Sequence, residues 1–242
     1  MDFEKTELAD GRAVLYRGDS LELLKAGLLK CDAIVSDPPY GIGYQRGAGG
    51  AGGISAPIYT GKIIGDDQPF DPAPWVEHAN GSAIVLFGAD HYKTRLPDGG
   101  RFICWDKSCG QGAAAASSDA EFAWTNRRNA RSIYRHFWTG ATRSCDGFDA
   151  KSKARAHVSQ KPVNLMAWCI EHARIGLDKV VLDPYMGAGS TGVAALLSGR
   201  GGRCLRCSLC GSEAVPQPYA RDASWYEHDD RMQPASKRAI LP

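Results

Sequence analysis

The sequence predicts an α/β domain with a mostly parallel sheet and helices on both of its faces. Two of the strand-length runs, "DAIVSD" (32–37) and "SAIVLFG" (82–88), are apolar throughout their middles and do not alternate. Strands that are buried on both faces have this pattern. Helix-length segments separate such runs, as expected for parallel strands joined by crossovers. The chain has 242 residues, of which 43% are hydrophobic, enough for one domain with a substantial core.

The first half of the chain contains three predicted elements and one unusual segment. "AVLYRGD" (13–19) predicts a strand that ends in a Gly-Asp turn, and "SLELLKAG" (20–27) predicts a short helix capped by Ser20. Residues 32–37 predict a buried strand. Residues 44–65 are rich in glycine and poor in bulky side chains, so we expect a mobile loop or a lid there.

The second half continues the alternation of strands and helices. "RFICWDK" (101–107) and "EFAWTN" (121–126) predict strands, and "KPVNLMAWCIEHA" (161–173) predicts a helix with Pro162 in its first turn. Residues 179–199, "KVVLDPYMGAGSTGVAALLSG", predict a strand, a glycine loop and a helix. We find no internal repeat.

Composition excludes some classes of protein. No apolar run approaches the roughly 18 residues of a membrane span, and the N-terminus lacks the layout of a signal peptide, so we expect a cytoplasmic protein without a membrane partner. Of the 8 cysteines, Cys204, Cys207 and Cys210 form a C-x-x-C-x-x-C run. A zinc-stabilised tail is one reading of this run, but no fourth ligand is evident nearby, and we predict no metal site.

The glycine loop after residue 182 has the residue types of a ligand site. A predicted strand ends at Asp183, and Gly187 and Gly189 allow close approach of a ligand to the backbone. Ser190 and Thr191 then begin a helix whose N-terminus favours negative charge. Such loops also join strands to helices without any ligand, so both readings remain open at this point.

The segment "SDPPY" (36–40) also has two readings. It is either a strand that prolines terminate, or a rigid loop that presents a carboxylate, carbonyl groups and an aromatic ring. Asp37 and a proline carbonyl can together accept both hydrogens of an exocyclic amine, and Tyr40 can stack on the heterocycle that carries the amine.

Taken together, these motifs resemble the DNA amino-methyltransferases, which use S-adenosylmethionine to methylate adenine N6 or cytosine N4. "DPPY" resembles the catalytic motif of that family, and "DPYMGAGSTG" resembles its cofactor loop. "HVSQKPVNLMAWCIE" resembles the segment that precedes the cofactor loop in that family, and "YRGDSLELL" resembles the segment that precedes the catalytic motif. The resemblance extends from about Val14 to Gly199. The catalytic motif comes first, which is the permuted order of the family's beta class.

The resemblance implies a Rossmann-like methyltransferase fold over residues 1–199, S-adenosylmethionine as cofactor and double-stranded DNA as partner. It leaves a homodimer and a cognate restriction enzyme open. It implies catalytic roles for Asp37, Pro38, Pro39 and Tyr40. It implies cofactor contacts for Asp19, Gln160, Lys161, Asp183, Pro184, Gly187, Gly189, Ser190 and Thr191.

An aspartate at the start of the motif favours adenine N6 as the target, with cytosine N4 as the alternative. DNA contacts are expected from a basic segment at about residues 127–157. Between residues 127 and 155 it has eight basic residues against two acidic ones, a net of +6 in a chain whose total is +2. The basic residues are Arg127, Arg128, Arg131, Arg135, Arg143, Lys151, Lys153 and Arg155. A solvated basic face is the other reading.

The resemblance ends abruptly at Gly199. The family continues with an apolar strand whose terminal acid holds the ribose of the cofactor, whereas this chain has "RGGRCLRCSLCGSEA". We therefore expect residues 200–242 to form an irregular C-terminal tail and the sheet to lose a central strand. A shift of the reading frame near this point is one explanation, and the nucleotide sequence would settle it. A degenerate relative that binds DNA without catalysis is the alternative function.

Overall fold

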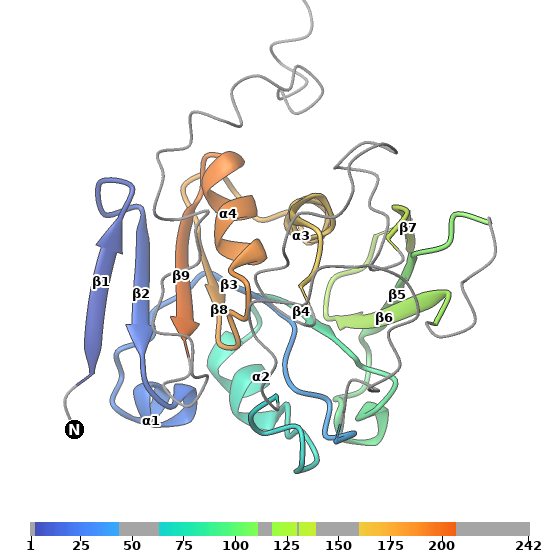
Figure 1. Ribbon diagram of the computed structural model, residues 1–242, viewed down its shortest axis with the longest axis horizontal. Coiled ribbons are helices and arrows are strands. Elements are labelled where there is room, and N and C mark those ends of the chain that lie inside the picture. Colours follow the sequence, from blue (N-terminus) through green and yellow to red (C-terminus); the bar gives the residue numbers. More distant parts are fainter. Residues whose placement is uncertain (1–2, 44–62, 111–117, 130, 139–159, 207–242) are drawn as a thin grey trace, which may run out of the picture.

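The computed structural model describes residues 3–43, 63–110, 118–129, 131–138 and 160–206, the last six by their backbone alone. Nine strands in this part of the chain form one sheet in the order β1-β2-β9-β8-β3-β4-β6-β5-β7 (Figure 1). The strands are β1 Glu4–Leu8, β2 Ala13–Arg17, β3 Ala33–Ser36, β4 Ala83–Phe87, β5 Arg101–Asp106, β6 Ala120–Thr125, β7 Ile133–Arg135, β8 Val180–Asp183 and β9 Gly201–Arg206. The helices are α1 Ser20–Lys25, α2 Ala73–Ala79, α3 Val163–His172 and α4 Ser190–Leu197, with a 3-10 turn η1 at Lys93–Arg95.

Strand directions decide which loops meet. The five strands β2, β9, β8, β3 and β4 are all parallel, which confirms a mostly parallel sheet. Strand β6 is antiparallel to both β4 and β5, and β7 is parallel to β5. One edge of the sheet therefore collects the carboxyl ends of β3, β4, β5 and β8 together with the start of β6. We call this the carboxyl edge.

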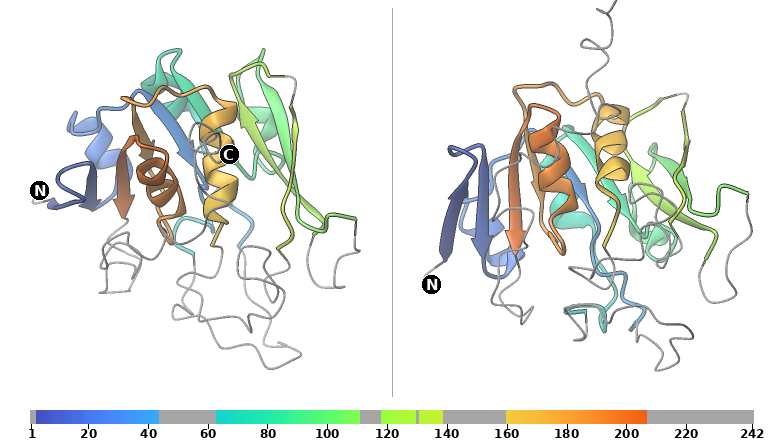
Figure 2. Two further views of the ribbon diagram at one scale, coloured as in Figure 1. Left: turned by 90° about the horizontal axis from the view of Figure 1, so that it is seen from above. Right: turned by 45° about the horizontal axis from the view of Figure 1, so that its top comes forward.

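Helices cover both faces of the sheet, as the sequence predicts. On one face, Val35 of β3 belongs to a buried cluster with Leu165 of α3 and with residues of α4. On the other face, its neighbour Ile34 belongs to a second cluster with Leu23 of α1 and Trp75 of α2. Adjacent strand residues point to opposite faces, so the continuous apolar strands serve both layers. Figure 2 shows the two helical layers on either side of the sheet.

Most of the predicted elements are confirmed, and the strands β1, β7 and β9 and the helix α2 are new. The sequence predicts β2, β3, β4, β5, β6, β8 and the helices α1, α3 and α4 to within a few residues. It misses β1, whose polar sequence "EKTEL" pairs with β2 at the sheet edge, where charged residues are common. It also misses the short helix α2 and the three-residue strand β7.

The predicted cap of α1 is wrong. Ser20 is the first residue of the helix, and the N-cap is Asp19, whose Oδ1 accepts hydrogen bonds from the backbone N–H groups of Leu21 at 2.8 Å and Glu22 at 3.0 Å. Aspartate is among the strongest N-cap residues because its carboxylate satisfies N–H groups that have no partner within the helix. Asp19 therefore has a structural role in addition to the cofactor contact that the resemblance implies.

The prediction of an irregular chain directly after residue 200 is also wrong. Residues 201–206 form β9, which lies between β2 and β8 and is parallel to both. Without it, the inner backbone groups of β2 and β8 would lack hydrogen-bond partners. The backbone thus completes the sheet even though the sequence lacks an apolar run.

Several predicted features lie outside the described residues. These are most of the glycine-rich segment, the basic residues from 139 to 159, and the tail from 207 onward, which includes Cys207 and Cys210. Among the residues that the structure does describe, no helix is long and apolar enough to cross a membrane.

Candidate active site

Two loops distant in sequence lie side by side at the carboxyl edge. Strands β3 and β8 are parallel neighbours, so the loop that starts at Asp37 and the glycine loop that follows Asp183 emerge together. The buried Ser36 hydroxyl donates a hydrogen bond of 2.6 Å to Oδ1 of Asp183. The structure therefore brings together the two motifs whose combination the sequence singles out, and ligands of open α/β sheets bind at this edge.

Asp66 fixes the course of the 37–42 loop. Its Oδ1 accepts hydrogen bonds from the backbone N–H groups of Tyr40 and Gly41, each at 2.9 Å, and from that of Ile42 at 3.4 Å. Only 4% of Asp66 is exposed. The sequence analysis missed this residue, because no local pattern connects an acid to a loop 25 residues earlier. Buried backbone donors require such an acceptor.

The ring of Tyr40 packs closely against Gly88 and His91. A Cβ atom at Gly88, which follows β4, would lie 2.1 Å from two carbons of this ring, so only glycine permits the approach. His91 stacks on Tyr40 with ring centroids 5.2 Å apart and an interplanar angle of 19°. The His91 imidazole therefore covers one face of the Tyr40 ring, and a stacked base would make the same kind of contact with that ring.

A buried ammonium joins the two predicted groups of the catalytic loop. Lys161 Nζ lies 2.7 Å from Asp37 Oδ2 and donates to the Tyr40 hydroxyl at 3.1 Å. That hydroxyl donates to Asp37 Oδ1 at 2.6 Å. The sequence associates Lys161 with the cofactor, whereas the structure places its ammonium against Asp37.

Two further charged residues extend this cluster. Glu121, at the start of β6, has Oε2 at 3.0 Å from Lys161 Nζ and Oε1 at 2.8 Å from Lys107 Nζ. Lys107 follows β5 directly and is 13% exposed. The sequence analysis missed both as site residues. The available signal was a glutamate at the start of an otherwise apolar strand and a lysine at the end of another. We call Asp37, Lys161, Glu121 and Lys107 the charge chain.

The electrostatics of the charge chain follow from burial opposed by pairing. Burial raises the pKa of Asp37, and the nearby Lys161 ammonium opposes that rise. Burial also disfavours the Glu121 carboxylate, but Lys161 and Lys107 outweigh it and lower the pKa of Glu121 to about 2. Burial acts against the charge of Lys161, yet Asp37 and Glu121 raise its pKa. Pairing therefore favours the charged forms of Glu121 and Lys161, whereas at Asp37 burial outweighs it.

The glycine loop has the donors of an anion site. Gly187 and Gly189 both adopt positive φ, 51° and 79°, and Gly189 precedes the first turn of α4 without a side chain to cap it. The backbone N–H groups of that turn favour a carboxylate or phosphate. Ser190 and Thr191 are buried, and the Ser190 hydroxyl donates to the carbonyl of Lys161 at 2.6 Å. This bond ties the glycine loop to the backbone of the charge chain.

The other residues that the resemblance implies as cofactor contacts differ in position and burial. Asp19 follows β2 at the same edge but caps α1. Gln160 is half-buried directly before Lys161, and Pro184 is buried directly after β8. In the catalytic motif, Pro38 is buried and Pro39 is half-buried.

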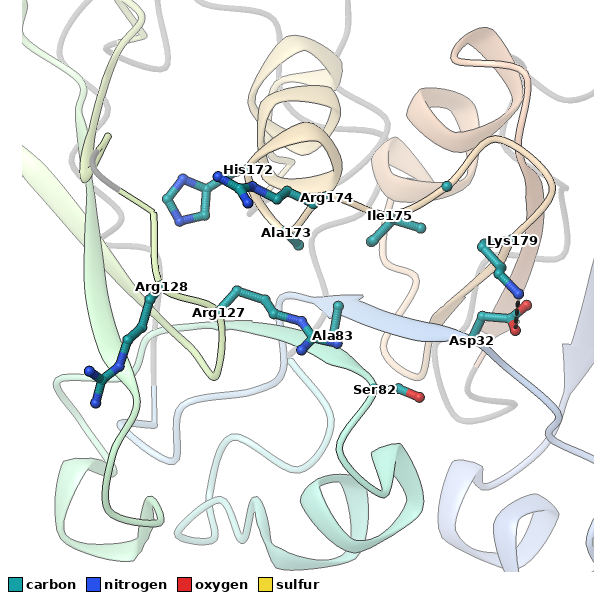
Figure 3. A pocket seen from close by; sticks show the side chains of 11 residues that line it. Asp32, Ser82, Ala83, Arg127, Arg128, His172, Ala173, Arg174, Ile175 and Lys179 are labelled. Carbon is teal, nitrogen blue, oxygen red and sulfur yellow. Dashed lines mark hydrogen bonds and ion pairs between the residues drawn. The ribbon is translucent and has the colours of Figure 1, made fainter.

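The predicted basic segment is split between opposite edges of the sheet. Because β6 is antiparallel to β4, Arg127 lies beside the start of β4, where its guanidinium donates to the Gly81 carbonyl at 3.2 Å. Arg127 and Arg128 line a cavity of about 480 Å³ there, together with Arg174 and Lys179 (Figure 3). Arg131 precedes β7 on that side. Of the four basic residues of the segment that the structure describes, only Arg135 reaches the carboxyl edge, where its Nε lies 3.5 Å from Asp106 Oδ2. The other four basic residues lie outside the described ranges.

Comparison with solved structures places the fold. PvuII DNA methyltransferase (cytosine-N4-specific) is similar with a TM-score of 0.53 at 12% identity, covering 90% of this chain and 94% of its own. M1.HpyAVI has 23% identity and a TM-score of 0.48, with 80% and 91% of the two chains covered. TTHA0409 from Thermus thermophilus has 16% identity and a TM-score of 0.45, with 85% and 90% covered. No curated protein matches the sequence.

The parallel sheet with helices on both faces, together with the PvuII likeness, defines a Rossmann-like fold of the methyltransferase class. Residues 101–207 match the model of N6_N4_Mtase, DNA methylase. Over these residues the chain is similar to the DNA amino-methyltransferases, as its sequence motifs predict. The matched range contains Lys107, Glu121, Lys161 and the glycine loop, and it ends one residue after β9.

Replacing Asp66 tests its hold on the catalytic loop. Asp66→Ala leaves three backbone N–H groups without their acceptor, so we expect a loss of about 1–3 kcal/mol in the free energy of unfolding. Urea unfolding measures it, with the exposed neighbour Asp67→Ala as the matched control. Equal midpoints for the two variants would contradict the assigned role.

The buried carboxyl of Asp183 predicts a pH dependence of stability. Burial raises its pKa from 3.8 to about 6, although the Ser36 hydroxyl favours the charged form. A raised pKa means that the folded protein binds the proton more tightly, so this contribution is present below about pH 4 and is lost as the pH rises to about 6. Asp183→Asn keeps the acceptor for Ser36 but cannot ionise. Its stability relative to the wild type should therefore increase by about 3 kcal/mol over that interval.

Urea unfolding between about pH 3.5 and 7.5 measures this difference. The exposed Asp178→Asn is the control, and its curve should run parallel to that of the wild type. A wild type and an Asp183→Asn variant with parallel curves would show that Asp183 does not titrate in this interval.

Proposed function

We propose that this chain transfers a methyl group from S-adenosylmethionine to the exocyclic N6 of adenine in DNA. The observation that carries the proposal is the joining of the Asp37 loop to the glycine loop through Ser36 and Asp183, 2.6 Å apart at the edge of two parallel strands. The match of residues 101–207 to the DNA methylase model supports methyl transfer to DNA. Asp37 at the start of the catalytic motif supports adenine over cytosine.

The donors of the glycine loop fit the cofactor. The uncapped first turn of α4 and the positive-φ residues Gly187 and Gly189 suit the carboxylate of its methionine part. Bound S-adenosylmethionine supplies a sulfonium methyl group, which passes to the amine nitrogen as the carbon–sulfur bond breaks and its electron pair stays on sulfur. Asp183 lies at the start of this loop, fixed by Ser36 and by the backbone N–H of Tyr185 at 3.1 Å.

The residues of the catalytic loop orient the amine. Asp37 and the Pro38 carbonyl accept its two hydrogens, so that its lone pair points toward the methyl group. As the nitrogen gains positive charge, the Asp37 carboxylate stabilises it, and one proton is then lost to water. Tyr40 stacks on the flipped base, with His91 making way on the face that it now covers. Positioning supplies most of the rate gain, because no covalent intermediate is needed.

Methyl transfer to unmodified duplex DNA tests the proposal. With tritiated S-adenosylmethionine, we expect the wild type to label DNA, the exposed control Asp98→Ala to match it, and Asp37→Ala to fall by about 100-fold or more. Nucleoside analysis of the product should give N6-methyldeoxyadenosine. N4-methyldeoxycytidine would replace the proposed base. A wild type that neither labels DNA nor binds the cofactor by calorimetry would support the non-catalytic alternative.

The division of the basic segment predicts which arginine meets DNA. Arg135 is exposed at the carboxyl edge, whereas Arg127 is at the opposite edge. Arg135→Ala should weaken DNA binding and reduce the slope of log affinity against log salt by about 1, the value for one phosphate contact. Arg127→Ala should leave both unchanged. Fluorescence anisotropy from about 50 to 200 mM salt measures the slopes, and a loss only in Arg127→Ala would reverse the orientation of DNA.

A further inference from the structure

The charge chain runs in one line of alternating sign from the catalytic loop to β5. Asp37 pairs with Lys161 at 2.7 Å, Lys161 with Glu121 at 3.0 Å, and Glu121 with Lys107 at 2.8 Å. All four side chains are largely buried, with exposures of 15%, 7%, 23% and 13% in that order. Lys161 is therefore shared between two carboxylates, of which only Asp37 belongs to the catalytic motif.

Both carboxylate oxygens of Asp37 are already engaged. Oδ1 accepts from the Tyr40 hydroxyl and Oδ2 from the Lys161 ammonium. If Asp37 accepts a hydrogen of the target amine, one of these contacts must be given up. The Lys161 ammonium has a second acceptor within reach, Oε2 of Glu121. It can therefore move away from Asp37 and still keep a carboxylate as its counter-charge.

We propose that Glu121 is a positioning residue for methyl transfer, which holds the Lys161 ammonium so that Asp37 can accept the target amine. This inference rests on the proposed function. Lys107 in turn holds Glu121 in place. Neither Glu121 nor Lys107 touches the reacting atoms in this scheme, and both act through Lys161.

Charge gives the first reason. A buried ammonium with a single carboxylate partner stays on that partner, because moving away would leave both charges unpaired in a poorly solvated site. Without Glu121, Lys161 would compete directly with the amine for Asp37. The amine also gains positive charge during transfer, and an uncompensated ammonium beside it would oppose that gain. The negative charge of Glu121 offsets the positive charge of Lys161 while the target amine beside it becomes positive.

Rigidity gives the second reason. Glu121 is paired in register with Trp105 of β5, and the backbone N–H of Lys107 donates to the Asp119 carbonyl at 2.8 Å. Two paired strands therefore fix the relative positions of Glu121 and Lys107. Groups on strands are positioned more accurately than groups on loops, which suits a residue that must hold another in place.

The isosteric variant Glu121→Gln tests the role through kinetics. We expect kcat to fall about 100-fold, the effect of a misplaced reactive group, while the Kd for S-adenosylmethionine by calorimetry stays within about twofold. Lys107→Met, which leaves Asp37, Lys161 and Glu121 in place, should lower kcat about 10-fold. The exposed Glu77→Gln is the matched control and should equal the wild type. An unchanged kcat in Glu121→Gln would overturn the proposal.

A double-mutant cycle separates this role from a purely structural one. If Glu121 acts through Lys161, then in a Lys161→Met background the change Glu121→Gln should alter kcat by less than about twofold. Thermal unfolding of each variant shows whether it is folded. A full effect of about 100-fold in both backgrounds would show that Glu121 does not act through Lys161.

A readout without methyl transfer keeps this test separate from the proposed function. Carboxyl carbon NMR can follow the titration of Asp37 in the full-length protein. Removing the negative charge of Glu121 leaves Lys161 to Asp37 alone, so the pKa of Asp37 should fall in Glu121→Gln and stay unchanged in Glu77→Gln. An unchanged pKa in Glu121→Gln overturns the coupling. A wild type that shows this shift but no methyl transfer would refute the proposed function and leave the coupling intact.

Discussion

The parallel pairing of β3 with β8 is the constraint on which the site depends. These strands are distant in sequence, yet Ala33 pairs with Val181 and Ile34 with Leu182. Their shared direction makes both following loops emerge at one edge, and the Ser36–Asp183 hydrogen bond joins them there. Hydrogen-bonded strands are rigid, so the distance between the loops is set by the sheet and varies little with the loops themselves.

The second element of the design is charge balance in a poorly solvated place. Asp37 alone would be driven toward its neutral form by burial, and Lys161 alone toward its neutral amine. Each carboxylate of the charge chain instead has an ammonium partner within 3.0 Å. Such pairs are retained only where the geometry is good, and here strands β3, β5 and β6 and the Ser190 hydroxyl of α4 supply it.

The sequence predicts what is local and misses what the sheet brings together. Asp37 and Asp183 could be predicted because each follows an apolar strand directly within a short motif. Asp66 and Glu121 could not, since their partners are distant in sequence and the contacts depend on tertiary structure. The sequence favours a single DNA-binding strip for the basic segment because net charge contains no information on strand direction. Because β6 is antiparallel to β4 whereas β7 is parallel to β5, Arg127 after β6 and Arg135 at the end of β7 lie at opposite edges of the sheet.

Strand β9 separates the requirements of the fold from those of the cofactor. The sheet needs only backbone groups at this position, and residues 201–206 supply them although none of them is acidic. A ribose contact needs a particular side chain, which the backbone cannot replace. Asp37, by contrast, is positioned by β3, by Lys161 and by the loop that Asp66 holds in place. The orientation of the target amine that we propose therefore does not require an acidic residue on β9.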